Sequence, residues 1–339
     1  MKPMLEMTLP ELTAAVEQLG EKPFRAKQLA DWVWKKGQTS PAAMSNVPNR
    51  LVEAFDILSS RVVGRGDSAD GTFKLLLEMA DGQRAECVLI PTAERATACL
   101  STQVGCAMGC TFCATGADRL VRNLSAGEML EQVLHLWREH GGKPTNVVFM
   151  GMGEPLANYD ATVAAVRAIV APDRLGISAR RVTVSTVGLP GPIRRLAAED
   201  LPITLAISLH APNDAIRRQI IPIAERHPLE KVLAAAEAFY EARRREVTLE
   251  YCLLRGVNDS ALCAEGLARI AGRLRCNVNV LEYNPVAALP YERPSRRAVE
   301  QFVGRLKKHG VNVNRRRSRG QDADAACGQL RSRLAGQEG

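Results

Sequence analysis

Three cysteines, Cys106, Cys110 and Cys113, lie within the short stretch CAMGCTFC. Their CxxxCxxC spacing supplies three thiolates close together. Structural zinc sites and ordinary iron–sulfur electron carriers use four protein ligands, which leave no position for a substrate. Three thiolates, in contrast, leave one iron of a [4Fe–4S] cluster open. The alternative, a zinc site or structural cysteines, needs a fourth ligand nearby, and neither Cys99 nor His135 stands at a familiar spacing.

A glycine-rich bend follows the next apolar run, where VVFM leads into GMGEPL. Glycines allow a ligand to approach the backbone closely. Such a bend alone could simply end a strand. Together, the cysteine spacing after an apolar strand and the bend one unit later resemble the radical SAM superfamily. The resemblance implies that the open iron binds the amino and carboxylate groups of S-adenosylmethionine (SAM), and that Gly153 and Glu154 bind its amino group.

Further candidate ligands stand where three other apolar runs end. They are Ser185 after VTV, Ser208, Leu209 and His210 after ITLAI, and Asn284 after NVLEY. Hydroxyl, amide and imidazole groups at one edge of a sheet could bind the ribose, carboxylate or adenine of SAM. Taken singly, each is equally expected to be a strand cap. Their shared position is the reason that we predict them as SAM-binding residues.

These candidates need a scaffold that brings several strand ends together, and the chain beyond residue 96 alternates between strand-like and helical stretches. The strand-like runs are Cys99–Val104, Val147–Met150, Val182–Val187, Ile203–Leu209, Val247–Leu253 and Val278–Tyr283, and the helical stretches include Ala126–Arg138 and Leu229–Arg245. This alternation predicts right-handed crossovers and a parallel sheet of about six βα units. The predicted fold is α/β, a partial (β/α)6 parallel barrel of the radical SAM type, with the strand-end loops gathered at one face.

Two smaller segments precede the predicted barrel. Apolar residues recur at helical spacing over residues 9–19 and 24–34, before a break at Gly37. Between about residues 61 and 91 the period changes to two, and LLLEM and ECVLI flank the turn signal Asp81-Gly82. We therefore expect a helical module over residues 1–60, a β-hairpin lead-in over 61–95, the barrel over 96–320 and a C-terminal segment over 321–339.

Composition narrows the class of protein. The 339 residues carry a formal net charge of +8, which suits a polyanion such as nucleic acid, although a mildly basic enzyme would show the same balance. No apolar run approaches the roughly 20 residues of a membrane-spanning helix, and the N-terminus lacks a secretory leader pattern. We expect a cytoplasmic protein, in which nine cysteines are ligands, catalysts or core residues rather than lasting disulfides.

Several motifs together resemble the RlmN/Cfr group of RNA methyltransferases. They are QVGCAMGCTFCATG, GMGEPLANY, SLHAPND, RGVND, YNP and DADAACGQL, and the resemblance runs nearly end to end. The chain looks closer to the RlmN branch, which implies methylation of adenine C2 in 23S rRNA and in tRNA. It also implies that the helical module binds RNA. We expect a monomer that receives electrons from a one-electron reductant such as flavodoxin or ferredoxin.

The same resemblance implies three catalytic residues outside the cluster. Cys327 takes a methyl group from one SAM as a thiolate nucleophile. The 5′-deoxyadenosyl radical made from a second SAM removes a hydrogen atom from that methyl group, and the methylene radical adds to the adenine carbon. Glu86 then accepts the ring proton, and Cys99 attacks Cys327 to form a transient disulfide. Without the resemblance, we would interpret Glu86 as an exposed strand residue, Cys327 as a surface thiol and Cys99 as a core cysteine.

Two basic runs are candidate phosphate contacts. Arg315, Arg316, Arg317 and Arg319 precede Cys327, whereas Arg243, Arg244 and Arg245 end a predicted helix and could simply complement its C-terminus. We favour the first run, because the segment that carries Cys327 must meet the RNA. Aromatic residues make up only 4% of the chain, so the target base is expected to flip into a pocket rather than to stack on an extended platform.

Three other activities remain open at the level of sequence. Cfr-like methylation at adenine C8 uses the same motifs. A radical SAM activase that installs a glycyl radical would need the cluster but neither Cys99 nor Cys327. A non-catalytic iron–sulfur protein that binds RNA would not cleave SAM. The remaining cysteines match no family role and are expected to be structural; they are Cys87, Cys252, Cys263 and Cys276.

Overall fold

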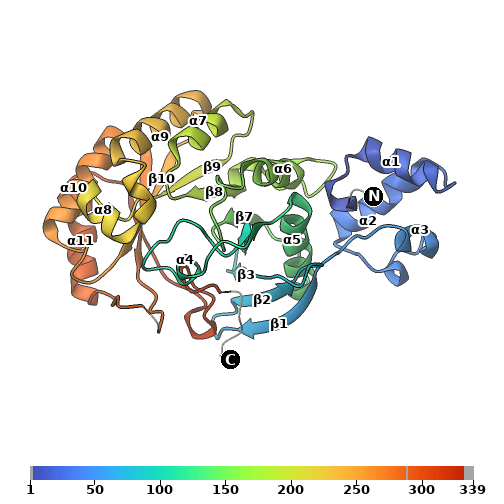
Figure 1. Ribbon diagram of the computed structural model, residues 1–339, viewed down its shortest axis with the longest axis horizontal. Helices are drawn as coiled ribbons and strands as arrows, with labels where there is room; N and C mark the ends of the chain where they lie inside the picture. The colour runs from blue at the N-terminus through green and yellow to red at the C-terminus, as the bar shows by residue number, and fades with distance from the viewer. Residues whose placement is uncertain (1–2, 288, 332–339) are drawn as a thin grey trace.

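A helical module lies beside an α/β barrel in the computed structural model, which describes residues 3–287 and 289–331 (Figure 1). The module contains α1 (Leu9–Gln18), α2 (Phe24–Lys36), α3 (Asn49–Glu53) and short 3₁₀ turns at Met4–Glu6 and Pro41–Ala43. A capping box between Thr8 and Glu11 begins α1, and Gly37, at φ 65°, ends α2. Glu6 accepts a hydrogen bond from the Gly127 N–H group at 2.8 Å, which ties the module to the barrel.

A single ten-stranded sheet runs through the rest of the chain. Its strands are β1 (Arg61–Asp67), β2 (Phe73–Glu78), β3 (Arg84–Pro91), β4 (Ala96–Cys99), β7 (Asn146–Phe149), β8 (Val182–Thr186), β9 (Thr204–Ser208), β10 (Val247–Leu253), β11 (Cys276–Glu282) and β12 (Val313–Arg316). The strands from β1 to β4 pair antiparallel, and those from β4 to β12 pair parallel. The lead-in hairpin thus continues directly into the parallel barrel.

Helices cover the outer face of the parallel strands (Figure 1). They are α5 (Ala126–His140), α6 (Tyr159–Val170), α7 (Pro190–Ala198), α9 (Leu229–Arg243), α10 (Ala261–Arg273) and α11 (Arg296–Lys308). The short helix α8 (Asp214–Ile220) lies instead beside the ends of β8 and β9, and further 3₁₀ turns occur at Ala179–Arg181, Pro222–Glu225 and Gln321–Ala323. Among the residues that the structure describes, no helix has the length and apolar character needed to cross a membrane. The predicted α/β class, with six crossovers between parallel strands, is confirmed.

The first predicted barrel strand, Cys99–Val104, is wrong as a single strand. The ladder of β4 ends at Cys99, and residues 103–104 form β5, which pairs with β6 (Arg122–Asn123) in a separate two-stranded sheet. Ser101 lies at the break, where its N–H group donates to the side chain of Gln132 at 2.8 Å instead of to a neighbouring strand. Polar residues that satisfy the backbone in this way allow the chain to leave the sheet.

Two strands of the sheet were not predicted, and they form its edges. β1 is exposed along much of its length and contains two glycines, Gly64 and Gly66, which are poor strand formers. β12 runs through the basic sequence VNRR and shows little apolar alternation. Pairing with only one neighbour and partial exposure remove the hydrophobic pattern by which inner strands are predicted.

Candidate active site

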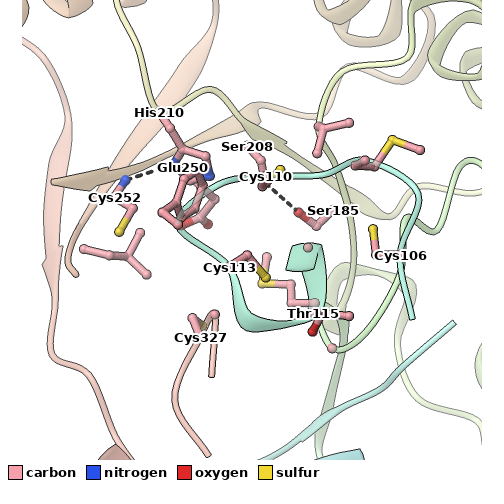
Figure 2. Close-up of a pocket in the computed structure, with 18 of the residues that line it drawn as sticks. Cys106, Cys110, Cys113, Thr115, Ser185, Ser208, His210, Glu250, Cys252 and Cys327 are labelled. Atoms are coloured by element: carbon pink, nitrogen blue, oxygen red, sulfur yellow. Dashed lines mark hydrogen bonds between the residues drawn. The ribbon is translucent and has the colours of Figure 1, made fainter. Parts of the chain in front are cut away.

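A cavity of about 170 Å³ lies at the carboxyl ends of the parallel strands. Its lining contains all three CxxxCxxC cysteines, Cys106, Cys110 and Cys113, and it also reaches Cys327 (Figure 2). Most of the predicted SAM ligands line the same cavity; they are Gly153, Glu154, Ser185, Ser208, His210 and Asn284. The fold therefore gathers residues that stand up to 221 positions apart in the chain, from Cys106 to Cys327.

The cysteine loop is anchored to the segment that follows β9. The Thr111 N–H group donates to the Ile220 carbonyl at 3.0 Å, and the ring of Phe112 meets that of His210 edge-to-face at 5.0 Å between centroids. Cys113 then begins the short helix α4 (Ala114–Ala117). These contacts fix the three thiols at the edge of the cavity while leaving its interior open.

The donor set fits an iron–sulfur cluster better than a single ion. Within residues 3–287 and 289–331, no three His, Cys, Asp or Glu side chains converge closely enough to hold one metal ion. Cysteines that each bind a different iron of a cluster need not converge on one point. Burial raises the pKa of Cys106 to about 11 and that of Cys110 and Cys113 above the ordinary thiol value, so uncompensated thiolates are disfavoured there. A cationic group bound by all three would offset that cost.

Close packing within the protein shapes the GMGE bend. Gly153 has φ +96°, and a Cβ atom there would lie 2.6 Å from Cβ of Gln103. The carboxylate of Glu154 accepts hydrogen bonds from the N–H groups of Leu156 at 3.0 Å and Val187 at 2.8 Å. Burial raises the pKa of Glu154 to about 7, while these hydrogen bonds lower it. Glu154 thus joins the bend to the end of β8 and is one of the residues that line the cavity.

Replacing Gly153 by alanine is expected to destabilise the protein by about 2 kcal/mol or more, because the backbone strain and the Gln103 overlap add. The overlap is with a side-chain Cβ and Cγ atom and a backbone nitrogen, at 2.6 to 2.9 Å. Urea unfolding measures the change. Gly191→Ala is the matched control, since a Cβ atom on Gly191 would meet no heavy atom within 4 Å. Equal stability of the two variants would contradict the packing argument.

The predicted ligands at the ends of β8 and β9 occupy different positions. Ser185 and Ser208 are neighbours in the cavity lining, and their hydroxyl oxygens lie 3.4 Å apart. His210 adopts φ 54°, and its Nδ1 accepts the Cys252 N–H group at 2.9 Å, which leaves Nε2 as the protonated nitrogen (Figure 2). Burial, and to a smaller extent Arg217, lower the pKa of His210 to about 3. Leu209, whose side chain is fully buried, is not among the residues that line the cavity.

Residues 320–331, named here the Cys327 segment, cross the barrel mouth and are held from several sides. Asn284 donates to the Cys327 carbonyl at 3.0 Å and accepts from Gln321 at 3.0 Å. The Ala114 N–H group donates to the Gly328 carbonyl at 2.8 Å, which links the segment to the cysteine loop. Both polar atoms of the Asn284 amide are therefore engaged with the segment, although the side chain also lines the cavity.

A second, larger cavity of about 720 Å³ opens at the opposite end of the barrel. Residues near the amino ends of the parallel strands line it, including Thr97, Asn146, Thr183, Thr204, Thr248 and Asn314. Six arginines but only one carboxylate, Glu250, belong to its lining; the arginines are Arg95, Arg180, Arg181, Arg316, Arg317 and Arg319. We name it the basic cavity. It meets the first cavity at Met150, Glu250, Leu281, Asn284, Arg316 and Cys327.

The predicted catalytic residues are not all brought to one place. Cys99, at the end of β4, and Cys327 both line the basic cavity. Burial raises the pKa of Cys99 to about 12, and the neighbouring Cys327 adds to the shift. Glu86, in contrast, is completely buried on β3 and lines neither cavity. Its Oε2 atom accepts the Arg331 N–H group at 2.8 Å, so the Cys327 segment covers it.

Several polar residues of the site were missed at the level of sequence. Arg217, fully buried on α8, donates to the carbonyls of Leu209 and Val187 and so joins the ends of β9 and β8. Glu250 and Arg316, whose charged atoms lie 3.6 Å apart, stand where the two cavities meet. Adjacent arginines and charged residues within strands occur throughout the chain. The local sequence therefore does not distinguish those whose side chains point into the barrel.

The arginines of the two basic runs make different contacts. Arg315 pairs with Glu282 at 2.6 Å, and Arg319 donates to the Pro91 carbonyl at 3.1 Å, so only part of the first run is available to a ligand. Arg243, Arg244 and Arg245 make local contacts with Asp200, Glu241 and Thr204. Arg180 and Arg181, which no sequence motif marked, are exposed and line the basic cavity, and neither forms an ion pair within the described part of the chain.

Comparisons with known proteins agree with this architecture. A model of the radical SAM superfamily matches residues 100–264, and a model of the ribosomal RNA large subunit methyltransferase N-terminal domain matches residues 3–56. A crystal structure of a radical SAM methyltransferase from Sphaerobacter thermophilus is 41% identical and superposes with a TM-score of 0.94, covering 98% of this chain and 99% of that one. The module and the barrel thus occur together in a solved protein.

Relatives of nearly full length carry one name. The probable dual-specificity RNA methyltransferase RlmN of Rhodopirellula baltica is 44% identical, covering 97% of this chain and 90% of the relative. The protein of the same name from Synechocystis is 45% identical, covering 97% of this chain and 95% of the relative.

Proposed function

Because the chain belongs to the RlmN family of radical SAM enzymes, we propose that it methylates C2 of an adenosine in 23S rRNA and in tRNA. One observation carries the proposal: Cys327 faces two cavities at once, one with the three cluster cysteines and one with Cys99. A thiol that must first receive a methyl group and later be attacked by a second thiol needs access to both. An activase or an RNA-binding iron–sulfur protein would need no such arrangement.

The first cavity suits a cluster and SAM. A [4Fe–4S] cluster on Cys106, Cys110 and Cys113 would supply the electron that cleaves SAM to the 5′-deoxyadenosyl radical. Ser185, Ser208 and His210 would bind SAM with hydroxyl and imidazole groups, and Glu154 would hold the bend against its amino group. The Asn284 amide would contribute mainly by fixing the Cys327 carbonyl, which keeps the thiol pointed at the SAM methyl group.

The basic cavity suits the RNA. Arginine guanidinium groups bind phosphates strongly, and six of them surround an opening that ends at Cys99 and Cys327. We propose that the flipped adenosine enters from this end, so that the base meets Cys327 from the side opposite the cluster. The helical module would contact the RNA outside the barrel. We expect a monomer, a cytoplasmic location and a flavodoxin-like or ferredoxin-like electron donor.

Removing the charges of Arg180 and Arg181 is expected to weaken RNA binding. Two lost phosphate contacts should raise the Kd about tenfold at physiological salt and reduce the slope of log K against log salt by about 2. Filter binding over a salt series measures both, using an RNA hairpin that carries the target adenosine. Arg194→Gln is the matched control, because Arg194 is an exposed arginine on α7 that lines neither cavity. An unchanged salt slope in the double variant would place the RNA elsewhere.

The proposed reaction is tested by nucleoside mass spectrometry on rRNA and tRNA from a host that lacks its own enzyme and expresses this protein. The expected product is 2-methyladenosine in both RNA classes. Only 8-methyladenosine would move the activity to C8, for which the same cavities would serve. Neither product, from protein with an intact cluster, would refute RNA methylation.

A further inference from the structure

A buried ion pair lies beneath the Cys327 segment. Nζ of Lys74 on β2 is 2.9 Å from Oε1 of Glu86 on β3, and the two side chains are 6% and 0% exposed. Lys74 pairs across the ladder with Val88, and Glu86 with Leu76, so the two charged side chains are diagonal neighbours on one face of the hairpin. A buried charge is costly without a partner, so each of the two depends on the other.

Both groups also contact the Cys327 segment, one on each side of the thiol. Nζ of Lys74 donates to the Asp324 carbonyl at 3.3 Å, and the Arg331 N–H group donates to Oε2 of Glu86 at 2.8 Å. Asp324 has φ 48°, a left-handed conformation that is unfavourable for a residue with a side chain. The turn before Cys327 therefore depends on outside contacts such as the one from Lys74.

We infer that Lys74 is a positioning residue that ties Glu86 to the Cys327 segment, so that the base and the reactive thiol are held and released together. This inference rests on the proposed function, in which Glu86 accepts the ring proton. In the structure the Cys327 segment covers Glu86, an arrangement named here closed: Oε1 of Glu86 is ion-paired with Lys74, Oε2 accepts the Arg331 N–H group, and the side chain lines neither cavity. The segment must therefore lift before Glu86 can reach the RNA.

The charge of Glu86 then decides when the segment closes again. The proton that moves passes from the adenine ring carbon to the Glu86 carboxylate, which becomes a neutral acid. A neutral acid loses both the ion pair and the charge-assisted bond from Arg331. The segment returns only after Glu86 has given up the proton. Closure thus follows the completion of each methyl transfer.

The charges around Glu86 predict the direction of a pH effect. Burial raises the pKa of Glu86, Lys74 and the Arg331 N–H group lower it, and the carboxylate of Asp324 raises it; the Cys87 thiol next to Glu86 is itself protonated, because burial raises its pKa. Replacing Lys74 by a neutral residue removes the main group that favours the carboxylate. The acidic limb of the methylation rate should therefore move to higher pH.

Hydrogen exchange of residues 320–331 tests the inference without relying on activity. Lys74→Met is expected to speed exchange of this peptide roughly tenfold or more, since one partner of a buried pair is lost. Lys74→Arg keeps the charge and should restore slow exchange. Lys231→Met is the matched control, because Lys231 is an exposed lysine on α9. Lys74→Met/Glu86→Gln removes both charges, so it keeps the test available if the single variant fails to fold.

The pH profile of methylation separates positioning from a merely structural role. We expect the acidic limb to shift upward in Lys74→Met and to stay in place in Lys74→Arg. Exchange and pH profile that match the wild type in Lys74→Met would overturn the inference. If the wild-type protein makes no methyladenosine, the proposed function fails instead, and the exchange experiment still decides whether Lys74 holds the segment.

Discussion

Replacing Cys327 by alanine is expected to lower RNA methylation about 10⁴-fold or more, since covalent catalysis loses its nucleophile. In the closed arrangement Cys327 is the one thiol in the described part of the chain that lines both cavities. In the proposed arrangement, therefore, no other cysteine both receives the methyl group and meets the RNA. Transfer of label from methyl-labelled SAM to RNA measures the loss. Iron content should remain at the wild-type level, because Cys327 is not among the three predicted ligands.

The control for this experiment is another cysteine variant. Cys263→Ala alters a buried thiol on α10 that lines neither cavity and contacts the Ser260 hydroxyl at 3.2 Å. It should methylate RNA at close to the wild-type rate. If Cys327→Ala kept substantial activity while its iron content was normal, the methyl group would have to travel by a route that does not include Cys327.

Replacing Cys99 by alanine is expected to stop the reaction after bond formation to RNA. The adenosine would remain joined to Cys327 through the new carbon, because no second thiol attacks the sulfur. Multiple-turnover methylation should fall about 10²-fold or more, while a covalent protein–RNA adduct accumulates. A denaturing gel with labelled RNA detects the adduct, and mass spectrometry after nuclease digestion locates it on the peptide that contains Cys327.

Two comparisons make this second result specific. Cys276→Ala changes a half-buried cysteine at the start of β11, outside both cavities, and should leave no adduct. The double variant Cys99→Ala/Cys327→Ala should also form none, since the attachment point is missing. Free, fully methylated RNA from Cys99→Ala would mean that another group resolves the intermediate. Cys252, which lines the first cavity beside His210, is the thiol to replace next.

The sequence predicted the inner part of the fold because burial leaves a pattern. β10 has the predicted bounds, Val247–Leu253, and the other inner strands differ by a few residues at their ends. The break after Cys99 was not predicted, since the apolar run continues past the point at which Ser101 bonds to Gln132. β12 shows little apolar alternation, and β1, although it lies within the predicted hairpin region, is too exposed to be predicted as a third strand. Local periodicity indicates which side chains are buried, but it does not indicate which neighbouring strand a segment pairs with.

The site was predicted where chemistry depends on a local motif. The cysteine loop and the GMGE bend are each continuous in sequence, and the structure places both at the cavity. Contacts between segments that are distant in sequence could not be predicted in the same way. Lys74 and Glu86 meet Asp324 and Arg331 across some 250 residues of chain, as the separations of 250 and 245 positions show. The roles assigned to Glu86 and Cys99 stay predictions until the variants are measured.

The two-ended barrel has a consequence for inhibition. SAM and RNA approach Cys327 through separate mouths in the proposed arrangement, so a molecule that fills one mouth leaves the other accessible. An analogue of SAM should therefore show noncompetitive inhibition toward RNA, and a short oligonucleotide should show it toward SAM. A compound that spans the junction at Glu250 and Arg316 would exclude both substrates. Steady-state inhibition patterns thus test whether SAM and RNA bind through the two ends of the barrel independently of each other.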